Sequence, residues 1–173
     1  YLYRTCELIA LKGARYDAKR NFIKKFKSRH RYAYRKLNAG NIKDGLNFAE
    51  VWCAAKGCDN IQGLSDERQA FEEMLLNFSD FNLIGAAIEV EGRMAALAVA
   101  ERLAPDTLVM HIMKASAEID GLYPAILNEF LSREARGFEY LNMEQDLGVP
   151  GLRKSKLSYH PQRLIMKYAL RLK

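Results

Sequence analysis

The spacing of apolar residues predicts helices in the first 80 residues of the chain. In the segment DAKRNFIKKFKSRH, which begins at Asp17, Phe22, Ile23 and Phe26 fall on one side of a helix whose other sides are basic. Two more helices are expected over residues 41–56 and 65–78, the second with an N-cap at Ser65. The stretch YAYRKL, between the first two helices, alternates in polarity and predicts one strand.

From about residue 81 the spacing changes to that of β-strands. LIGAAIEV, RMAALAVAERL and TLVMHIMKA predict three consecutive strands, joined by turns at Glu91-Gly92 and at Pro105. A helix over 118–136, the strand FEYLNM, a short helix over 149–157 and the strand-like segment RLIMKYALRL are expected to follow. Because no linker or repeat interrupts this order, it predicts one α+β domain over 1–173, mostly helical over 1–80 and with a central sheet and crossover helix over 81–173.

The formal charge of +6 is unevenly distributed along the chain. Residues 12–36 hold eleven Lys and Arg against one acid, and residues 153–173 hold seven against none. Such segregation can create a positive face that binds RNA or an anionic lipid, although solvated helix faces beside acidic neighbours explain it equally well. Lys24 and Lys25, on the first basic helix, are the candidates there for contacts with a phosphate backbone.

The remaining composition limits the class of protein. No apolar stretch is long enough to span a bilayer, since LIGAAIEV is only strand-sized. Cys6, Cys53 and Cys58 match no zinc-binding spacing, so we expect no metal and interpret them as buried free thiols in a reducing cytoplasm. His111 has apolar neighbours in a predicted strand, where a packing role is expected.

The densest polar chemistry is the stretch NMEQDLGVPGLRKSKLSYHP, which begins at Asn142. Strand alternation in FEYLNM places Asn142 and Glu144 on one face where the strand ends. Glu144 or Asp146 could accept a proton from an attacking amine or hold an ammonium group. In the alternative interpretation, Asp146 caps the short helix near Gly148 and Glu144 pairs with Arg153.

The cations that follow are candidates for substrate binding. Arg153 and Lys156 lie three residues apart on the predicted short helix and could grip a phosphate of tRNA or lipid. They could equally complement the dipole at the C-terminal end of that helix. Ser158, directly after the helix, is a further candidate for substrate binding, and the ring of Tyr159 could simply pack.

The order of helices, three-strand meander, helix and further strands is similar to the GNAT acyltransferase fold. Three sequence segments resemble an uncharacterised bacterial family related to the soluble C-terminal domain of phosphatidylglycerol lysyltransferases. They are KGARYDAKRNFIKKFK, LIGAAIEVEGRMAALAVAERLAPDTLVMHIMKASAEIDGLYPAILNEF and YLNMEQDLGVPGLRKSKLSYHP. This resemblance implies a mixed, mostly antiparallel sheet flanked by helices, in the second half of a tandem GNAT-like protein. It further implies aminoacyl transfer from an aminoacyl-tRNA to an amine or hydroxyl, with Tyr159 as a general acid.

One departure from the GNAT pattern concerns the donor. Acetyl-CoA-binding members follow a central strand with a glycine-rich loop, whereas MKASAEIDGLYPAIL offers Gly121 alone beside Glu118 and Asp120. Carboxylates repel a pyrophosphate, and one glycine gives fewer free amides to bind it, so acetyl-CoA is not expected as the donor. The alternatives to aminoacyl transfer are a non-catalytic module for an anionic lipid or RNA, and an acetyl-CoA-dependent N-acetyltransferase.

Overall fold

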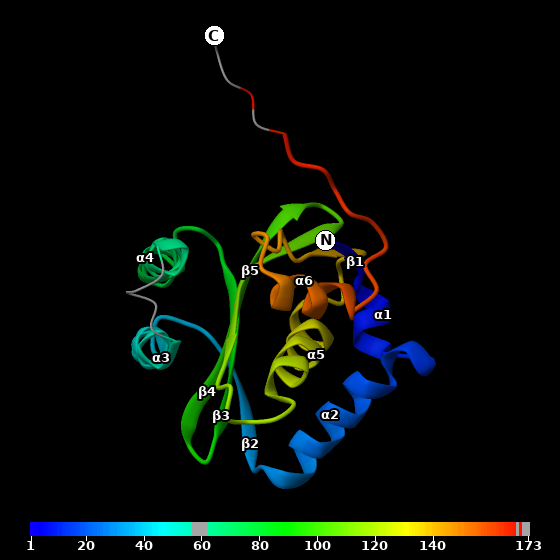
Figure 1. Cartoon of the computed structure of the whole chain (residues 1–173). Coiled ribbons are helices and arrows are strands. Elements are labelled where there is room, and N and C mark those ends of the chain that lie inside the picture. Colours follow the sequence, from blue (N-terminus) through cyan, green and yellow to red (C-terminus); the bar gives the residue numbers. More distant parts are fainter. Residues whose placement is uncertain (57–61, 169, 171–173) are drawn as a thin grey trace.

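The computed structural model describes residues 1–56, 62–168 and 170. One six-stranded open sheet, in the order β1-β6-β5-β4-β3-β2, runs through the middle of the chain (Figure 1). The strands are β1 (Leu2–Arg4), β2 (Tyr32–Lys36), β3 (Ile84–Val90), β4 (Arg93–Ala104), β5 (Thr107–Ala115) and β6 (Tyr140–Asn142). All neighbours are antiparallel except β5 and β6, which run parallel.

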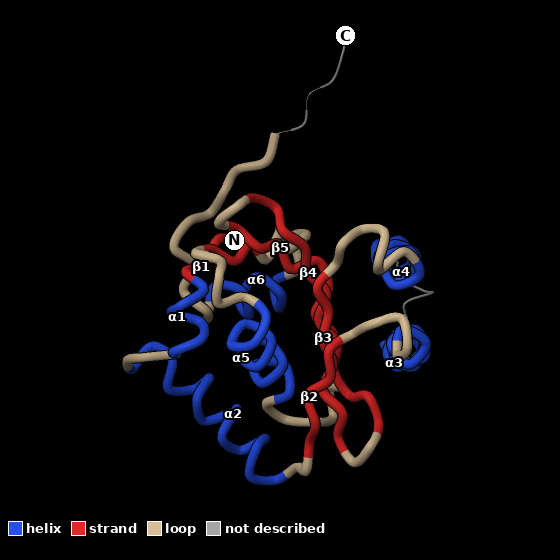
Figure 2. Tube along the Cα trace, turned by 180° about the vertical axis from the view of Figure 1, so that it is seen from behind, coloured by secondary structure: helices blue, strands red, loops and turns tan. Residues whose placement is uncertain are grey.

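Helices cover both faces of this sheet (Figure 2). One layer holds α1 (Thr5–Ala10), the short 3₁₀ turn η1 (Ala14–Tyr16), α2 (Asp17–Arg29), α5 (Leu122–Glu134) and α6 (Pro150–Leu157). The other layer holds α3 (Ile42–Lys56) and α4 (Gln62–Leu76). The predicted mixed, mostly antiparallel α+β fold with flanking helices is therefore confirmed.

Strand alternation divides the core between the two layers. On β4, Ala96, Ala98 and Ala100 face the cluster that includes α5, whereas Leu97 and Val99 face the cluster of α3 and α4. All five side chains are fully buried. The alanines leave room for α5, which supplies the large side chains of that layer, including Phe130. Large and small residues thus alternate across the strand so that each layer is filled.

Three local predictions differ from the structure. Phe22 is 45% exposed, because the buried stripe of α2 runs through Ile23 and Phe26. Ser65 is not an N-cap, because α4 already begins at Gln62. Cys6 is exposed rather than buried; Cys53 is buried, and Cys58 lies outside the described residues.

The two ends of the sheet region also differ from expectation. β6 spans only three residues, because the chain turns out of the sheet at Glu144, which has a φ of +54°. The backbone N–H of Glu144 donates a hydrogen bond to Asn142 Oδ1 (2.8 Å) at this turn. Residues 2–10 form β1 and α1, which the apolar pattern did not reveal. The segment RLIMKYALRL forms no strand among its described residues, and its one bridge joins Arg163 to Leu2. No helix in the described ranges is both long and apolar enough to cross a bilayer.

Gly121 provides a test of how the two helices α2 and α5 meet. Its φ is +82°, and a Cβ there would lie 2.3 Å from the carbonyl oxygen of Phe22. We expect Gly121→Ala to lower the free energy of unfolding, measured in urea, by roughly 2–4 kcal/mol, because it adds a backbone clash to the strain of a left-handed residue. Gly92→Ala is the matched control: its φ is +77° with nothing within 4 Å of the added Cβ, and it should cost only about 1–2 kcal/mol. Equal losses in the two variants would contradict the close contact.

Candidate functional site

The candidate site lies where β5 and β6 part. These parallel strands pair over only three positions, from Thr107–Tyr140 to Val109–Asn142. Beyond Asn142 the chain leaves the sheet, whereas β5 continues to Ala115. A parting of two central parallel strands leaves backbone groups on both sides without a ladder partner, and these must be satisfied in another way. We refer to this region, between residues 110–115 and 143–146, as the wedge.

Side chains satisfy backbone groups on both sides of the wedge. On the side of β6, Lys156 Nζ donates hydrogen bonds to the carbonyl oxygens of Met143 and Gln145, each at 2.5 Å. Burial lowers the pKa of Lys156. On the side of β5, the indole N–H of Trp52 donates to the carbonyl oxygen of Ala115 (3.0 Å). Lys156, predicted as a substrate-binding residue, is thus engaged with the backbone of the wedge.

A chain of three ionisable side chains crosses the wedge. His111 lies with Nδ1 3.1 Å from Glu144 Oε1 and Nε2 3.1 Å from Glu101 Oε1. The hydrogen bond with Glu144 raises the pKa of His111, and the same bond lowers the pKa of Glu144. An imidazolium between two carboxylates can donate to both, so this arrangement favours the charged form of each group. The Glu144 side chain remains 38% exposed and can therefore meet a ligand.

Asp146 is engaged in a structural cluster. It accepts hydrogen bonds from the Tyr1 hydroxyl (2.5 Å), from Arg153 Nε (2.7 Å) and from the backbone N–H of Gly148 (2.9 Å). Hydrogen bonds from Arg153 and Tyr1 lower the pKa of Asp146. Asp146 therefore makes the Gly148 contact of the alternative interpretation, whereas Arg153 pairs with Asp146 and not with Glu144. Of the two predicted acids, Glu144 is the one that reaches across the wedge.

The other predicted residues around this stretch have structural contacts. The Asn142 side chain accepts the hydrogen bond from Glu144 N–H that turns the chain out of β6. Ser158 Oγ donates to the carbonyl oxygen of Ser155 (2.6 Å). Tyr159 is 5% exposed, with Lys19 Nζ 3.8 Å from its ring centroid, and burial raises its pKa. Its ring belongs to the core cluster of the α5 layer, so in this structure it packs in the core.

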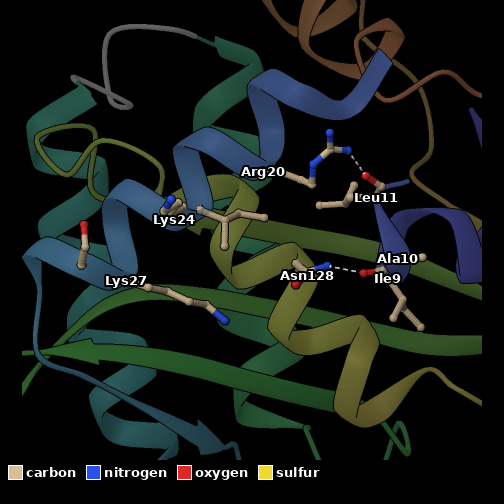
Figure 3. A pocket seen from close by; sticks show the side chains of 9 residues that line it. Ile9, Ala10, Leu11, Arg20, Lys24, Lys27 and Asn128 are labelled. Carbon is tan, nitrogen blue, oxygen red and sulfur yellow. Dashed lines mark hydrogen bonds between the residues drawn. The ribbon is translucent and has the colours of Figure 1, made fainter. Parts of the chain in front are cut away.

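The basic residues of α2 border a separate pocket of about 530 Å³ between α1, α2 and α5 (Figure 3). Lys24 lines this pocket, and Lys25 does not. Two neighbouring cations are engaged: Arg20 donates to the carbonyl oxygen of Leu11, and Lys27 pairs with Glu129. The pocket and the wedge therefore lie on different parts of the surface. Among the residues that the structure describes, no cluster of three or more His, Cys, Asp or Glu could hold a metal ion.

Sequence reasoning missed the partners of Glu144. His111 was expected to pack in the core, and Glu101 was not considered. A signal was available in the predicted meander, since Glu101 pairs with Val109 in the β4–β5 register and His111 follows two residues later. His111 is itself the extra residue of a register shift, because Val99 pairs with Ile112 and Ala100 with Met110, and such a bulge is not visible in the apolar pattern.

The charge state of His111 can be measured by NMR titration of its imidazole. We expect its pKa to lie above the ordinary value of about 6.5 and to fall in Glu144→Gln, because that change removes the largest cause of the rise. Since the folded pKa is raised, the charged imidazole stabilises the fold fully below about pH 6.5, and this contribution is lost as the pH rises through the folded pKa. Glu91→Gln, in an exposed turn, is the control. An unchanged His111 pKa in Glu144→Gln would contradict the ion pair.

Comparison with known proteins defines the family and the fold. The family model described as phosphatidylglycerol lysyltransferase, C-terminal, matches residues 1–171. A crystal structure of a conserved protein of unknown function from Bacteroides thetaiotaomicron is 36% identical, with a TM-score of 0.92, over 95% of this chain and 56% of that one. The structure of L-PGS from Bacillus licheniformis is 13% identical, with a TM-score of 0.63, over 92% of this chain and 56% of that one. This chain thus spans little more than half the length of either protein.

The fold extends to acetyltransferases. A possible acetyltransferase from Clostridium difficile is 9% identical, with a TM-score of 0.55, over 82% of this chain and 98% of that one. At this identity the similarity shows the GNAT fold alone. No curated protein sequence matches the chain. Because the family model covers nearly every residue, the chain belongs to the family of phosphatidylglycerol lysyltransferase C-terminal domains.

Proposed function

We propose that this chain transfers an aminoacyl group from an aminoacyl-tRNA to an amine or hydroxyl acceptor. The observation that carries the proposal is Glu144, a partly exposed carboxylate whose ionised form is favoured by His111 where β5 and β6 part. In this reaction the acceptor attacks the ester carbonyl carbon, the bond to the ribose oxygen breaks, and the proton of the acceptor passes to that oxygen. Holding the two reactants side by side in the wedge would supply much of the rate.

Glu144 is better suited to bind an ammonium group than to remove a proton. A carboxylate whose pKa is lowered is a weak base near neutral pH. An aminoacyl group carries an α-ammonium, and the exposed part of the Glu144 side chain can accept a hydrogen bond from it. Such a charged contact would fix the ester carbonyl relative to the acceptor. Family membership supports the reaction class, since the family description names a lysyltransferase.

The loop between β5 and α5 supports a donor other than acetyl-CoA. The backbone carbonyl oxygen of Phe22 on α2 lies against Gly121, directly before α5, so the negative end of a carbonyl dipole faces the start of this helix. Glu118 and Asp120, both exposed, add negative charge to the same loop. A donor whose reactive end carries no pyrophosphate meets less repulsion there.

Transfer of radiolabelled lysine from lysyl-tRNA to phosphatidylglycerol vesicles tests the proposal. Glu144→Gln should reduce the initial rate about 10- to 100-fold, because a hydrogen bond to a charged group contributes about 1.5–3 kcal/mol. Glu50→Gln, an exposed position on α3 in the opposite layer, should leave the rate unchanged. Absence of transfer by the unmodified chain, with tRNA binding retained, would favour a binding module. Micromolar binding of acetyl-CoA in calorimetry would instead favour an acetyltransferase.

The exposed cations of α2 provide a second, separate prediction. We expect Lys24→Gln combined with Lys25→Gln to weaken tRNA binding and to reduce the slope of log affinity against log salt by about 1–2, because each phosphate contact releases counterions. Lys43→Gln combined with Lys56→Gln, which changes two exposed lysines of α3, is the charge-matched control. Gel shifts at several salt concentrations measure both variants. An equal effect of the two pairs would show that net charge alone, and not the surface of α2, attracts the tRNA.

A further inference from the structure

The pocket between α1, α2 and α5 lies apart from the wedge and encloses about 530 Å³. Pockets that hold small organic ligands usually enclose roughly 300–1,000 Å³, so this pocket is large enough for one. Its lining combines four apolar side chains with three cations and two neutral polar groups. No Asp or Glu occurs among the described residues that line it, so the lining favours an anion.

The walls of this pocket are held in place by side-chain hydrogen bonds. Asn128 Nδ2, on α5, donates to the carbonyl oxygens of Leu8 (3.0 Å) and Ile9 (2.9 Å) in α1. Arg20, on α2, donates to the carbonyl oxygen of Leu11, directly after α1. Leu11 has a φ of +46°, a conformation that glycine adopts more easily than leucine. Because these bonds join the three helices, the pocket is formed without a ligand, and binding needs little reorganisation.

The three cations of the pocket come from successive turns of α2. Arg20, Lys24 and Lys27 are spaced four and three residues apart, which places them on one side of the helix. Two of them have partners in the protein, since Arg20 pairs with Asp17 and Lys27 pairs with Glu129. Lys24 is exposed and makes no hydrogen bond or ion pair with another residue that the structure describes. Its N–H donors are therefore available to a ligand.

Apolar side chains form the rest of the pocket wall. Ile9 and Ala10 come from α1, and Figure 3 shows them across the pocket from Lys24. Leu11 and Ile23 belong to the hydrophobic core and also line the pocket. An inorganic ion would leave this apolar surface in contact with water, whereas an organic group would cover it. The pocket therefore suits an anion that carries an apolar group.

We propose that the pocket binds a small organic phosphate monoester, with its phosphate at Lys24 and its organic group against α1. A phosphate monoester carries a charge of about −1.5 to −2 at neutral pH and has three strong acceptor oxygens. Lys24 can donate to these oxygens, and the donors of Arg20 and Lys27 that their partners leave free lie one turn away on either side. A carboxylate carries less charge and fewer oxygens, so it uses fewer of these donors. This site is additional to the transfer function proposed above.

NMR titration of the isotope-labelled chain with phenyl phosphate, in a buffer without phosphate, tests the proposal. The amide signals of Leu11, Ile23 and Asn128, one from each wall, should shift together and saturate. We expect Lys24→Gln to weaken the affinity about tenfold or more, because it removes hydrogen bonds between charged groups. Lys25→Gln is the matched control: Lys25 is exposed on the same helix but does not line the pocket, so the affinity should remain nearly unchanged.

Three reference compounds separate the contributions to binding. Inorganic phosphate should bind more weakly than phenyl phosphate, because it leaves the apolar wall uncovered. Phenol, which is uncharged at neutral pH, should not saturate the same signals. Benzoate should also bind more weakly than phenyl phosphate, and equal affinity for the two would show that the pocket does not select phosphate.

The remaining outcomes decide against the proposal. No saturable shift with phenyl phosphate, while the spectrum reports an intact fold, would show that the pocket takes no organic phosphate. Equal weakening by Lys24→Gln and Lys25→Gln would show that the net charge of α2 attracts the anion without a site in the pocket. Because the titration contains no tRNA and no aminoacyl donor, its result is independent of whether aminoacyl transfer occurs.

Discussion

The site depends on the early separation of β5 and β6. Two parallel strands in the middle of a sheet normally satisfy each other's backbone groups, and here they do so over three positions only. The ammonium group of Lys156 compensates by bonding two carbonyl oxygens of the departing chain. This interaction gives two of those carbonyl groups a partner, and a buried carbonyl that loses its partner costs free energy comparable to a lost hydrogen bond. The charged side chains of the site are arranged around the wedge.

Two acids that follow the same strand, separated by one residue, have different roles because of their surroundings. Asp146 accepts three hydrogen bonds from groups that hold the segment in place, whereas Glu144 contacts a histidine and remains partly exposed. The difference follows from the left-handed backbone at Glu144, which turns its side chain toward β5. Strand alternation alone would have given both residues similar surroundings, so the assignment needed the backbone conformation.

Much of the fold could be predicted from the apolar pattern, because helices such as α2 and strands such as β3 bury one face with a regular period. The candidate residues of the site were proposed because they follow a strand in a dense polar stretch. Their contacts could not be predicted, since Tyr1 and Asp146 are 145 residues apart and meet only through the pairing of β1 with β6. β1 itself was missed because three residues are too short to show a period. His111 was misjudged because its partners come from two other segments.

The small side chains of three alanines on β4 limit which amino acids these positions can accept. Ala96, Ala98 and Ala100 pack against the layer that contains α5, and each is fully buried. A larger side chain at any of them would displace the helix from the sheet rather than fill a void, because interiors are already packed to crystal-like density. The opposite face of the same strand carries Leu97 and Val99, which pack in the cluster of α3 and α4. Divergent sequences of this fold therefore need small residues at these three positions, because their size sets the spacing between the crossover helix and the strands that form the site.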